Sequence, residues 1–132
     1  MPYSKERLVR NSALLFVLAL PLFTGCGSSD AQHTAQVTTG GNSKHGAAAI
    51  ARYGCGSCHV IPGVSGAQGK VGPPLTGIAE RTYLAGQLPN TPDNMMRWIR
   101  NPQAVNPQTV MPNVGVTERD ARDIAGYLYT LR

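Results

Sequence analysis

Apolar residues recur at helical spacing in three segments of the chain, and no segment alternates apolar and polar positions as a strand would. The segment 117–131 has the longest apolar stripe, with members three and four residues apart: Ala121, Ile124, Ala125, Leu128 and Leu131. The other two predicted helices run from Ser43 toward Tyr53 and from Thr91 to Pro102. This pattern predicts an all-α domain.

Local residue choices mark where these helices begin. Thr91, Pro92 and Asp93 offer an N-cap, a first-turn proline and an acidic residue. Residues 117–120 read Thr-Glu-Arg-Asp, which is similar to a capping box with Asp in place of the preferred Glu. Ser43 can cap the first of the three helices. The start of each helix is therefore predicted from its own sequence.

The composition indicates that loops outweigh regular structure. Fifteen Gly and ten Pro occur among the 132 residues. A loop-rich domain of this size is only marginally stable through apolar burial alone, so it needs a covalent staple or a bound group at its centre. We expect a small fold of three to four helices with long loops wrapped around such a group.

The N-terminus has the features of an export signal. Residues 1–10 carry a net positive charge, and residues 12–23 form an apolar stretch of the length that signal peptides use. Pro21 interrupts this stretch, which is short for a membrane span. A signal peptide over residues 1–25 is the prediction, and a transmembrane anchor is the alternative.

Residues 22–26 read Leu-Phe-Thr-Gly-Cys and resemble the lipobox of bacterial lipoproteins. The resemblance implies that Cys26 carries a diacyl lipid after cleavage before it. The alternative is an ordinary cleavage site that contains a cysteine, which would leave an unpaired thiol in an oxidising compartment. We expect an exported protein in the periplasm or on the outer face of a bacterial membrane, attached to the bilayer through Cys26.

The segment that follows the predicted lipidation site is polar and has no apolar period. Such a composition is typical of a flexible linker. The predicted organisation is a signal peptide over residues 1–25, a lipidated flexible tether over residues 26–42, and a folded domain over residues 43–132.

Residues 55–59 read Cys-Gly-Ser-Cys-His, the attachment signature of c-type haem. In this chemistry the thiols of Cys55 and Cys58 add to the two haem vinyl groups, and His59 donates an imidazole nitrogen to the iron. A thioredoxin-like redox pair should follow a strand, and none is predicted before the motif. A zinc site needs two more ligands at close spacing. The motif therefore predicts one covalently bound haem c.

A haem iron with one histidine ligand can take a methionine sulfur as its second axial ligand. Met1 is lost with the predicted signal peptide, and Met95 and Met96 lie in a predicted helix, where methionine more often fills a core. Met111 lies in a predicted loop, and Pro112 biases it toward an extended backbone. We expect Met111 to be the second axial ligand.

Residues 43–132 resemble a class I cytochrome c at several positions beyond the haem motif. Residues 72–75 read Gly-Pro-Pro-Leu, similar to the family's loop in which the carbonyl matched here by Pro73 accepts a hydrogen bond from the axial histidine. Arg81 falls at the family's spacing for an arginine near a haem propionate. The resemblance further implies that Trp98 lies over the haem near the second ligand.

Residues 88–103 are similar to the cytochrome c domain fused to subunit II of some bacterial haem–copper oxidases. This chain has no copper-binding cupredoxin part, so we expect a free-standing relative of that fused domain. The family also packs its first and last helices across each other. Gly46 and Tyr127 are the candidates for that crossing.

The charge of the chain excludes one class of partner. Residues 26–132 carry nine basic and six acidic side chains, a net charge of +3. No basic cluster is interleaved with aromatic residues, so nucleic acid is not an expected partner. We also expect no small-molecule substrate.

The resemblance implies an electron-transfer protein rather than an enzyme. A six-coordinate iron between His59 and Met111 has no open position, which a peroxidase or a gas sensor would need. The predicted function is to carry single electrons between a quinol-oxidising complex and a terminal oxidase. The electron-accepting haem subunit of a periplasmic dehydrogenase is the alternative.

Overall fold

The computed structural model describes residues 27–132. The predicted signal peptide, residues 1–25, and the predicted lipidation site Cys26 lie outside the described residues. The described part contains five α-helices, two short 3-10 turns and one small sheet. None of these helices is long and apolar enough to cross a bilayer.

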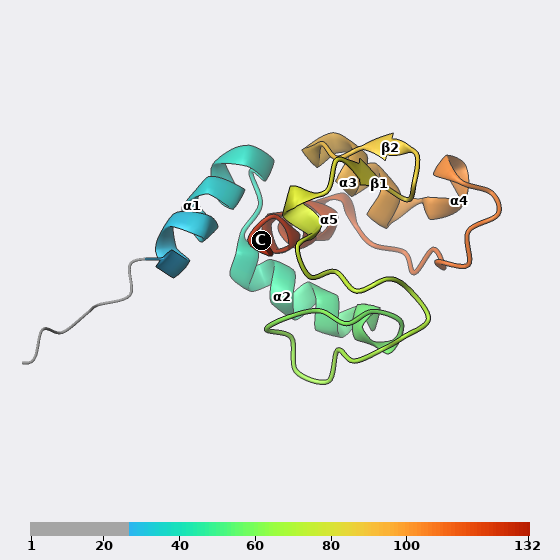
Figure 1. Cartoon of the computed structure of the whole chain (residues 1–132), viewed down its shortest axis with the longest axis horizontal. Coiled ribbons are helices and arrows are strands. Elements are labelled where there is room, and N and C mark those ends of the chain that lie inside the picture. Colours follow the sequence, from blue (N-terminus) through green and yellow to red (C-terminus); the bar gives the residue numbers. More distant parts are fainter. Residues whose placement is uncertain (1–26) are drawn as a thin grey trace, which may run out of the picture.

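Two helices that are far apart in the sequence cross at the centre of the molecule. Helix α2 (Ser43–Arg52) packs against helix α5 (Glu118–Leu128) (Figure 1). A Cβ placed on Gly46 would lie 2.0 Å from the carbonyl oxygen of Asp123 and 2.9 Å from the Cβ of Tyr127. Because Gly46 has no side chain, the two helices can approach until their backbones touch. The predicted crossing at Gly46 and Tyr127 is confirmed.

The core is one cluster of apolar side chains from α2, α5, helix α3 (Pro92–Arg100) and the loops between them. Its α5 members belong to the predicted apolar stripe: Ala121, Ile124, Ala125 and Leu128. Thr91 caps α3 as predicted, since its hydroxyl accepts a hydrogen bond from the amide of Asn94 at 3.3 Å. The helix ends before Pro102, as the sequence indicated.

A small antiparallel hairpin precedes α3. Strand β1 (Tyr83–Leu84) pairs with strand β2 (Leu88–Pro89), and Leu84 lies opposite Leu88. Strands of two residues are too short to show an alternating pattern, so the sequence did not predict them. The remaining regular elements are helical, and the all-α prediction is confirmed.

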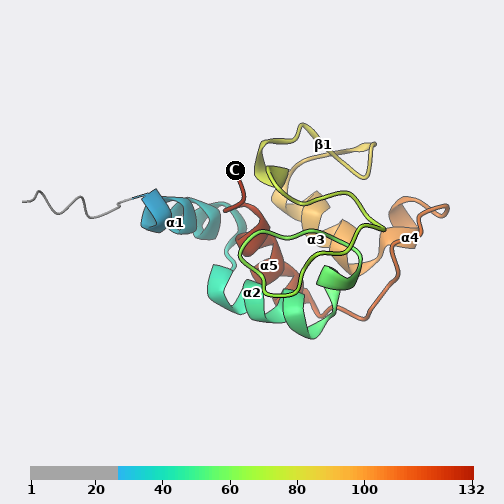
Figure 2. The same ribbon diagram turned by 60° about the horizontal axis from the view of Figure 1, so that its bottom comes forward.

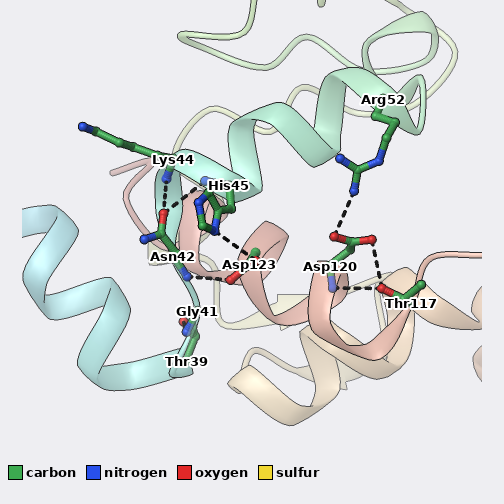
Figure 3. A network of polar contacts seen from close by, with 9 residues as sticks. All are labelled: Thr39, Gly41, Asn42, Lys44, His45, Arg52, Thr117, Asp120 and Asp123. Atoms are coloured by element: carbon green, nitrogen blue, oxygen red, sulfur yellow. Dashed lines mark hydrogen bonds and ion pairs between the residues drawn. The ribbon is translucent and has the colours of Figure 1, made fainter.

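Asn42, rather than the predicted Ser43, caps α2. The side-chain oxygen of Asn42 accepts hydrogen bonds from the backbone amides of Lys44 at 3.0 Å and His45 at 3.1 Å (Figure 3). Ser43 is instead the first helical residue. Asn and Ser are both strong N-cap residues, so their order in the sequence could not decide between them.

Thr117 caps α5 as predicted, but the capping box is not formed. The Thr117 hydroxyl accepts a hydrogen bond from the Asp120 amide at 3.2 Å and donates one to the Asp120 carboxylate at 2.9 Å (Figure 3). The Thr117 amide donates to the Tyr53 hydroxyl at 3.4 Å instead. Hydrogen bonds from Tyr53 and Thr117, together with the guanidinium of Arg52 at 2.9 Å, hold the pKa of Asp120 below its usual range. This network joins the end of α2 to the start of α5.

The segment that we predicted to be a flexible tether forms helix α1 (Gly27–Thr39) over most of its length. Ala35 is 1% exposed and Thr39 is 7% exposed, because α1 packs against α5. The prediction of flexibility was wrong for these residues. The side chains that α1 buries are two small ones, so the sequence shows no apolar stripe. Helix α1 lies at one end of the molecule and helix α4 (Pro102–Val105) at the other (Figures 1 and 2).

The turn between α1 and α2 is held tightly against α5. The amide of Gly41 donates to the Thr39 hydroxyl at 3.0 Å, and the amide of Asn42 donates to the Asp123 carboxylate at 2.7 Å (Figure 3). A Cβ on Gly41 would lie 2.0 Å from the carbonyl oxygen of Arg122. Only glycine therefore fits at this position with α1 docked as it is.

We predict that Gly41→Ala separates α1 from α5 and lowers the free energy of unfolding by about 1–3 kcal/mol, because the added methyl group must displace backbone atoms. A helix of this length is marginal in isolation, so the α1 amides should lose protection against hydrogen exchange. Val37→Ala is the control, since Val37 is 73% exposed on α1. Unchanged protection of α1 in Gly41→Ala would contradict the prediction.

Candidate functional site

The chain makes a tight turn directly after α2. Gly54 adopts a left-handed conformation with φ of 70°, which ends the helix and starts the 3-10 turn η1 (Cys55–Ser57). The backbone amides of Cys58 and His59 both donate to the carbonyl of Cys55, at 3.2 Å and 3.1 Å. This turn brings the two thiols and the imidazole of the sequence motif close together.

The imidazole of His59 is held from one side by backbone. Its Nδ1 lies 2.7 Å from the carbonyl oxygen of Pro73. A carbonyl can only accept, so Nδ1 carries the proton and Nε2 keeps a lone pair for a metal ion. A Cβ on Gly72 would lie 2.3 Å from Cε1 of the ring, so the backbone at Gly72 lies directly against the imidazole. The predicted role of Pro73 agrees with this geometry.

Both cysteines of the motif are free thiols in the described part of the chain. Burial raises the pKa of the Cys55 thiol, and the neighbouring Cys58 raises it further. The described residues contain no group of three or more His, Cys, Asp or Glu side chains that could hold a metal ion. Within residues 27–132, the side chains around the turn therefore do not form the ligand set that zinc usually takes.

The thiols and the imidazole open onto a cleft of about 350 Å³. Apolar side chains from α2, α3, α5 and the loops make up most of its wall, among them Ile50, Leu75, Ile78, Trp98, Ile124 and Leu128. Residues of the long loop after η1 line one part of the cleft, and residues of the loop between α4 and α5 line another. The cleft therefore suits a large apolar group that meets polar side chains at a few points only.

Met111 reaches this cleft from the loop between α4 and α5. The side chain of Gln103 donates to the Met111 carbonyl at 2.7 Å, and the Met111 amide donates to the Thr109 hydroxyl at 3.2 Å. Met95 also borders the cleft, but it is 2% exposed and belongs to the core cluster. Of the methionines in residues 27–132, Met111 alone lies outside a helix, on a segment held by side-chain hydrogen bonds.

Arg81 borders the cleft and also forms hydrogen bonds with the loop that carries Pro73. Its Nη2 donates to the carbonyl of Pro74 and, at 3.2 Å, to the carbonyl of Thr76. Of the residues that the sequence assigned to the cofactor, all seven line this one cleft: Cys55, Cys58, His59, Pro73, Arg81, Trp98 and Met111.

Comparison with known proteins identifies the family. The family model for cytochrome c matches residues 43–132, which is more than half of the chain. The chain belongs to the cytochrome c family. This cytochrome is similar to two curated proteins, each named cytochrome c oxidase subunit 2. The relative from Alkalihalophilus pseudofirmus is 35% identical over 79 residues, which are 59% of this chain and 22% of the relative.

The relative from Bacillus sp. (strain PS3) is 29% identical over 88 residues, which are 64% of this cytochrome and 25% of the relative. The matched region thus spans only about a quarter of the length of either relative. No solved structure matches the chain.

The residues present fit the covalently bound haem c that the family implies. The chain offers two free thiols for thioether bonds and an imidazole whose Nε2 keeps its lone pair, all on one turn. A separate loop brings a thioether sulfur to the same cleft, and the intervening walls are apolar. One nitrogen and one sulfur ligand, with cysteines beside the nitrogen, form the donor set that a haem iron in such a site takes.

Sequence reasoning missed two parts of this site. Gly72 belongs to the predicted loop at residues 72–75, but the sequence gave no reason why this residue must be glycine. Its contact with the His59 ring arises only because the loop folds back onto the haem motif. Tyr53 lines the cleft and binds Asp120 through its hydroxyl at 2.8 Å. Its place two residues before the haem motif was the one signal that could have suggested a role.

We predict that Gly72→Ala disturbs the axial histidine, because the new methyl group would occupy the space of the imidazole. The ring must rotate away from the Pro73 carbonyl, so the holoprotein should show a weakened low-spin haem spectrum and a lower yield of attached haem. Ser65→Ala is the control, since Ser65 lies exposed in the same loop. An identical spectrum and yield for Gly72→Ala and the unmodified protein would contradict this prediction.

Proposed function

We propose that this cytochrome carries single electrons through one covalently bound haem c, to or within a terminal oxidase. Cys55 and Cys58 would hold the haem by thioether bonds, and His59 and Met111 would be its axial ligands. The observation that carries the proposal is the meeting of these four side chains in one apolar cleft. When bound, haem c supplies an iron that gains and loses one electron.

The protein's own residues would favour electron transfer over catalysis at the iron. Pro73 fixes the orientation of the His59 imidazole, and the contacts of Gln103 and Thr109 hold the Met111 loop. Ligands held in this way need to move little between the two oxidation states. A position occupied by Met111 would also be closed to oxygen and peroxide, which a peroxidase must bind.

The similarity to subunit 2 of two cytochrome c oxidases supports a terminal oxidase as the electron acceptor. Those relatives are about four times longer than the matched region, so the acceptor is inferred from their names and from the likeness of the cytochrome c part alone. A quinol-oxidising complex is the donor that fits this place in a respiratory chain. Both complexes lie in a membrane, which is consistent with a lipid-anchored cytochrome.

We propose that Cys26 carries the lipid, and that α1 begins directly after this anchor. A helix of 13 residues is about 20 Å long, and α1 is docked on α5 instead of hanging free. The anchored end of α1 lies on the side of the molecule away from α4 and the neighbouring Met111 loop (Figure 1). This arrangement would turn the haem cleft away from the bilayer, toward the extramembrane part of a partner.

We predict that Met111→Leu leaves the haem attached but removes its second axial ligand. The variant should lose the long-wavelength Met–iron absorption band, have a lower reduction potential and bind carbon monoxide. Met95→Leu is the matched control, because it replaces a buried methionine with a side chain of similar volume. If Met95→Leu changed the spectrum and Met111→Leu did not, the ligand assignment would be wrong.

We predict that Cys26→Ser releases the cytochrome from the membrane or leaves an uncleaved precursor. The two acyl chains of a diacyl group suffice for stable anchoring, whereas one would be marginal. Membrane fractionation and mass spectrometry of the unmodified protein provide the measurement. A mature N-terminus at a residue other than Cys26, or the absence of lipid mass on it, would rule out the anchor and leave the electron-transfer proposal standing.

A further inference from the structure

Asn90, between β2 and α3, uses its whole side chain to join three segments of the fold. Its Nδ2 donates to the carbonyls of Ile78 and Arg81, each at 2.8 Å. Its Oδ1 accepts a hydrogen bond from the Tyr129 hydroxyl at 2.9 Å, and its backbone amide donates to the carbonyl of Thr82 at 2.9 Å. Asn90 is half-buried, so these partners are not readily replaced by water.

Of the two carbonyls that Asn90 binds, one belongs to the first residue of the 3-10 turn η2 (Ile78–Glu80) and the other to Arg81, which directly follows the turn. The same turn is held from its other side, since the amide of Ala79 donates to the carbonyl of Leu131 at 3.1 Å. Burial raises the pKa of the Tyr129 hydroxyl, so this group keeps its proton and remains a donor to Asn90. With its oxygen facing Tyr129, the amide of Asn90 can only turn its NH2 group toward η2.

The backbone that Asn90 fixes leads directly to the arginine of the haem cleft. Arg81 follows η2, and its Nη2 binds the carbonyls of Pro74 and Thr76. The neighbouring carbonyl of Pro73 is the partner of the His59 imidazole. A shift of the Arg81 backbone would therefore move a positive charge at the cleft and loosen the segment that orients the axial histidine.

We propose that Asn90 is a positioning residue for this cytochrome, which sets the reduction potential of the haem by holding Arg81 in place. The inference rests on the proposed function, because it concerns the haem iron. A positive charge beside the cleft favours the reduced iron, which carries one positive charge less than the oxidised iron. Loss of the Asn90 contacts should displace Arg81 and lower the potential.

A double-variant cycle tests the proposal by redox titration of the full-length holoprotein. We expect Asn90→Ala to shift the midpoint potential downward, in the same direction as Arg81→Gln. The variant with both changes should shift no further than Arg81→Gln alone, because Asn90 would act only through Arg81. Additive shifts, or an unchanged potential in Asn90→Ala, would overturn the proposal.

Asn94→Ala is the matched control. Asn94 lies four residues away and donates through Nδ2 to the carbonyl of Pro89 at 3.0 Å, a bond that joins α3 to β2 and not to η2. Its removal should leave the potential unchanged, and an equal shift in this variant would show that Asn90→Ala acts through general loosening. Tyr129→Phe keeps the ring and removes only the hydroxyl that orients Asn90, so it should give a smaller downward shift even if Asn90→Ala fails to fold. No shift in Tyr129→Phe in that case would count against the proposal.

The unmodified protein separates the two levels of inference. If it shows no reversible one-electron titration, the proposed electron-transfer function fails. If it titrates normally while the variant cycle is additive, only the role of Asn90 is rejected.

Discussion

The close contact between α2 and α5 is the constraint on which the rest of the structure depends. At Gly46 the two backbones touch, since a Cβ there would lie 2.0 Å from the Asp123 carbonyl. The Asp123 carboxylate also accepts a hydrogen bond from the amide of Asn42 at the start of α2. At the end of α2, Tyr53 and Arg52 bind the Asp120 carboxylate. The crossing is therefore fixed by contacts at both ends of α2 as well as in its middle. It sets where α2 ends, and with it the position of the haem motif.

The site is built from segments that have little regular structure of their own. Backbone hydrogen bonds and the contact at Gly72 hold the loop after η1 against the motif, and Arg81 holds it from the far side. A second set of side-chain contacts holds the Met111 loop. A domain this rich in glycine and proline has few helices with which to fix its ligands. Side-chain hydrogen bonds to loop carbonyls take over that role, as Asn90 illustrates.

Docking of α1 changes how an anchor at its N-terminal end would act. A flexible tether would only raise the local concentration of the cytochrome near a membrane. A helix that packs on α5 through Ala35 and Thr39, with Gly41 in close contact just after it, would also restrict the orientation of the haem cleft relative to the membrane. The contact consists of small side chains and backbone, so it depends on close fit more than on apolar area. The orientation that we infer for the cleft follows from this fit.

The sequence by itself determined the three longest helices of residues 43–132 and the chemistry of the site. Thr91 and Thr117 cap their helices as predicted, the stripe from Ala121 to Leu128 faces the core, and residues 55–59 carry the haem motif, because each of these signals is local. Only the tertiary structure decided what depends on residues far apart in the chain. It docked α1 through small side chains that leave no periodic pattern. It also set the backbone of Gly72 against His59, and it joined Asn90 to Tyr129 and η2, since such contacts form only when separate loops pack together.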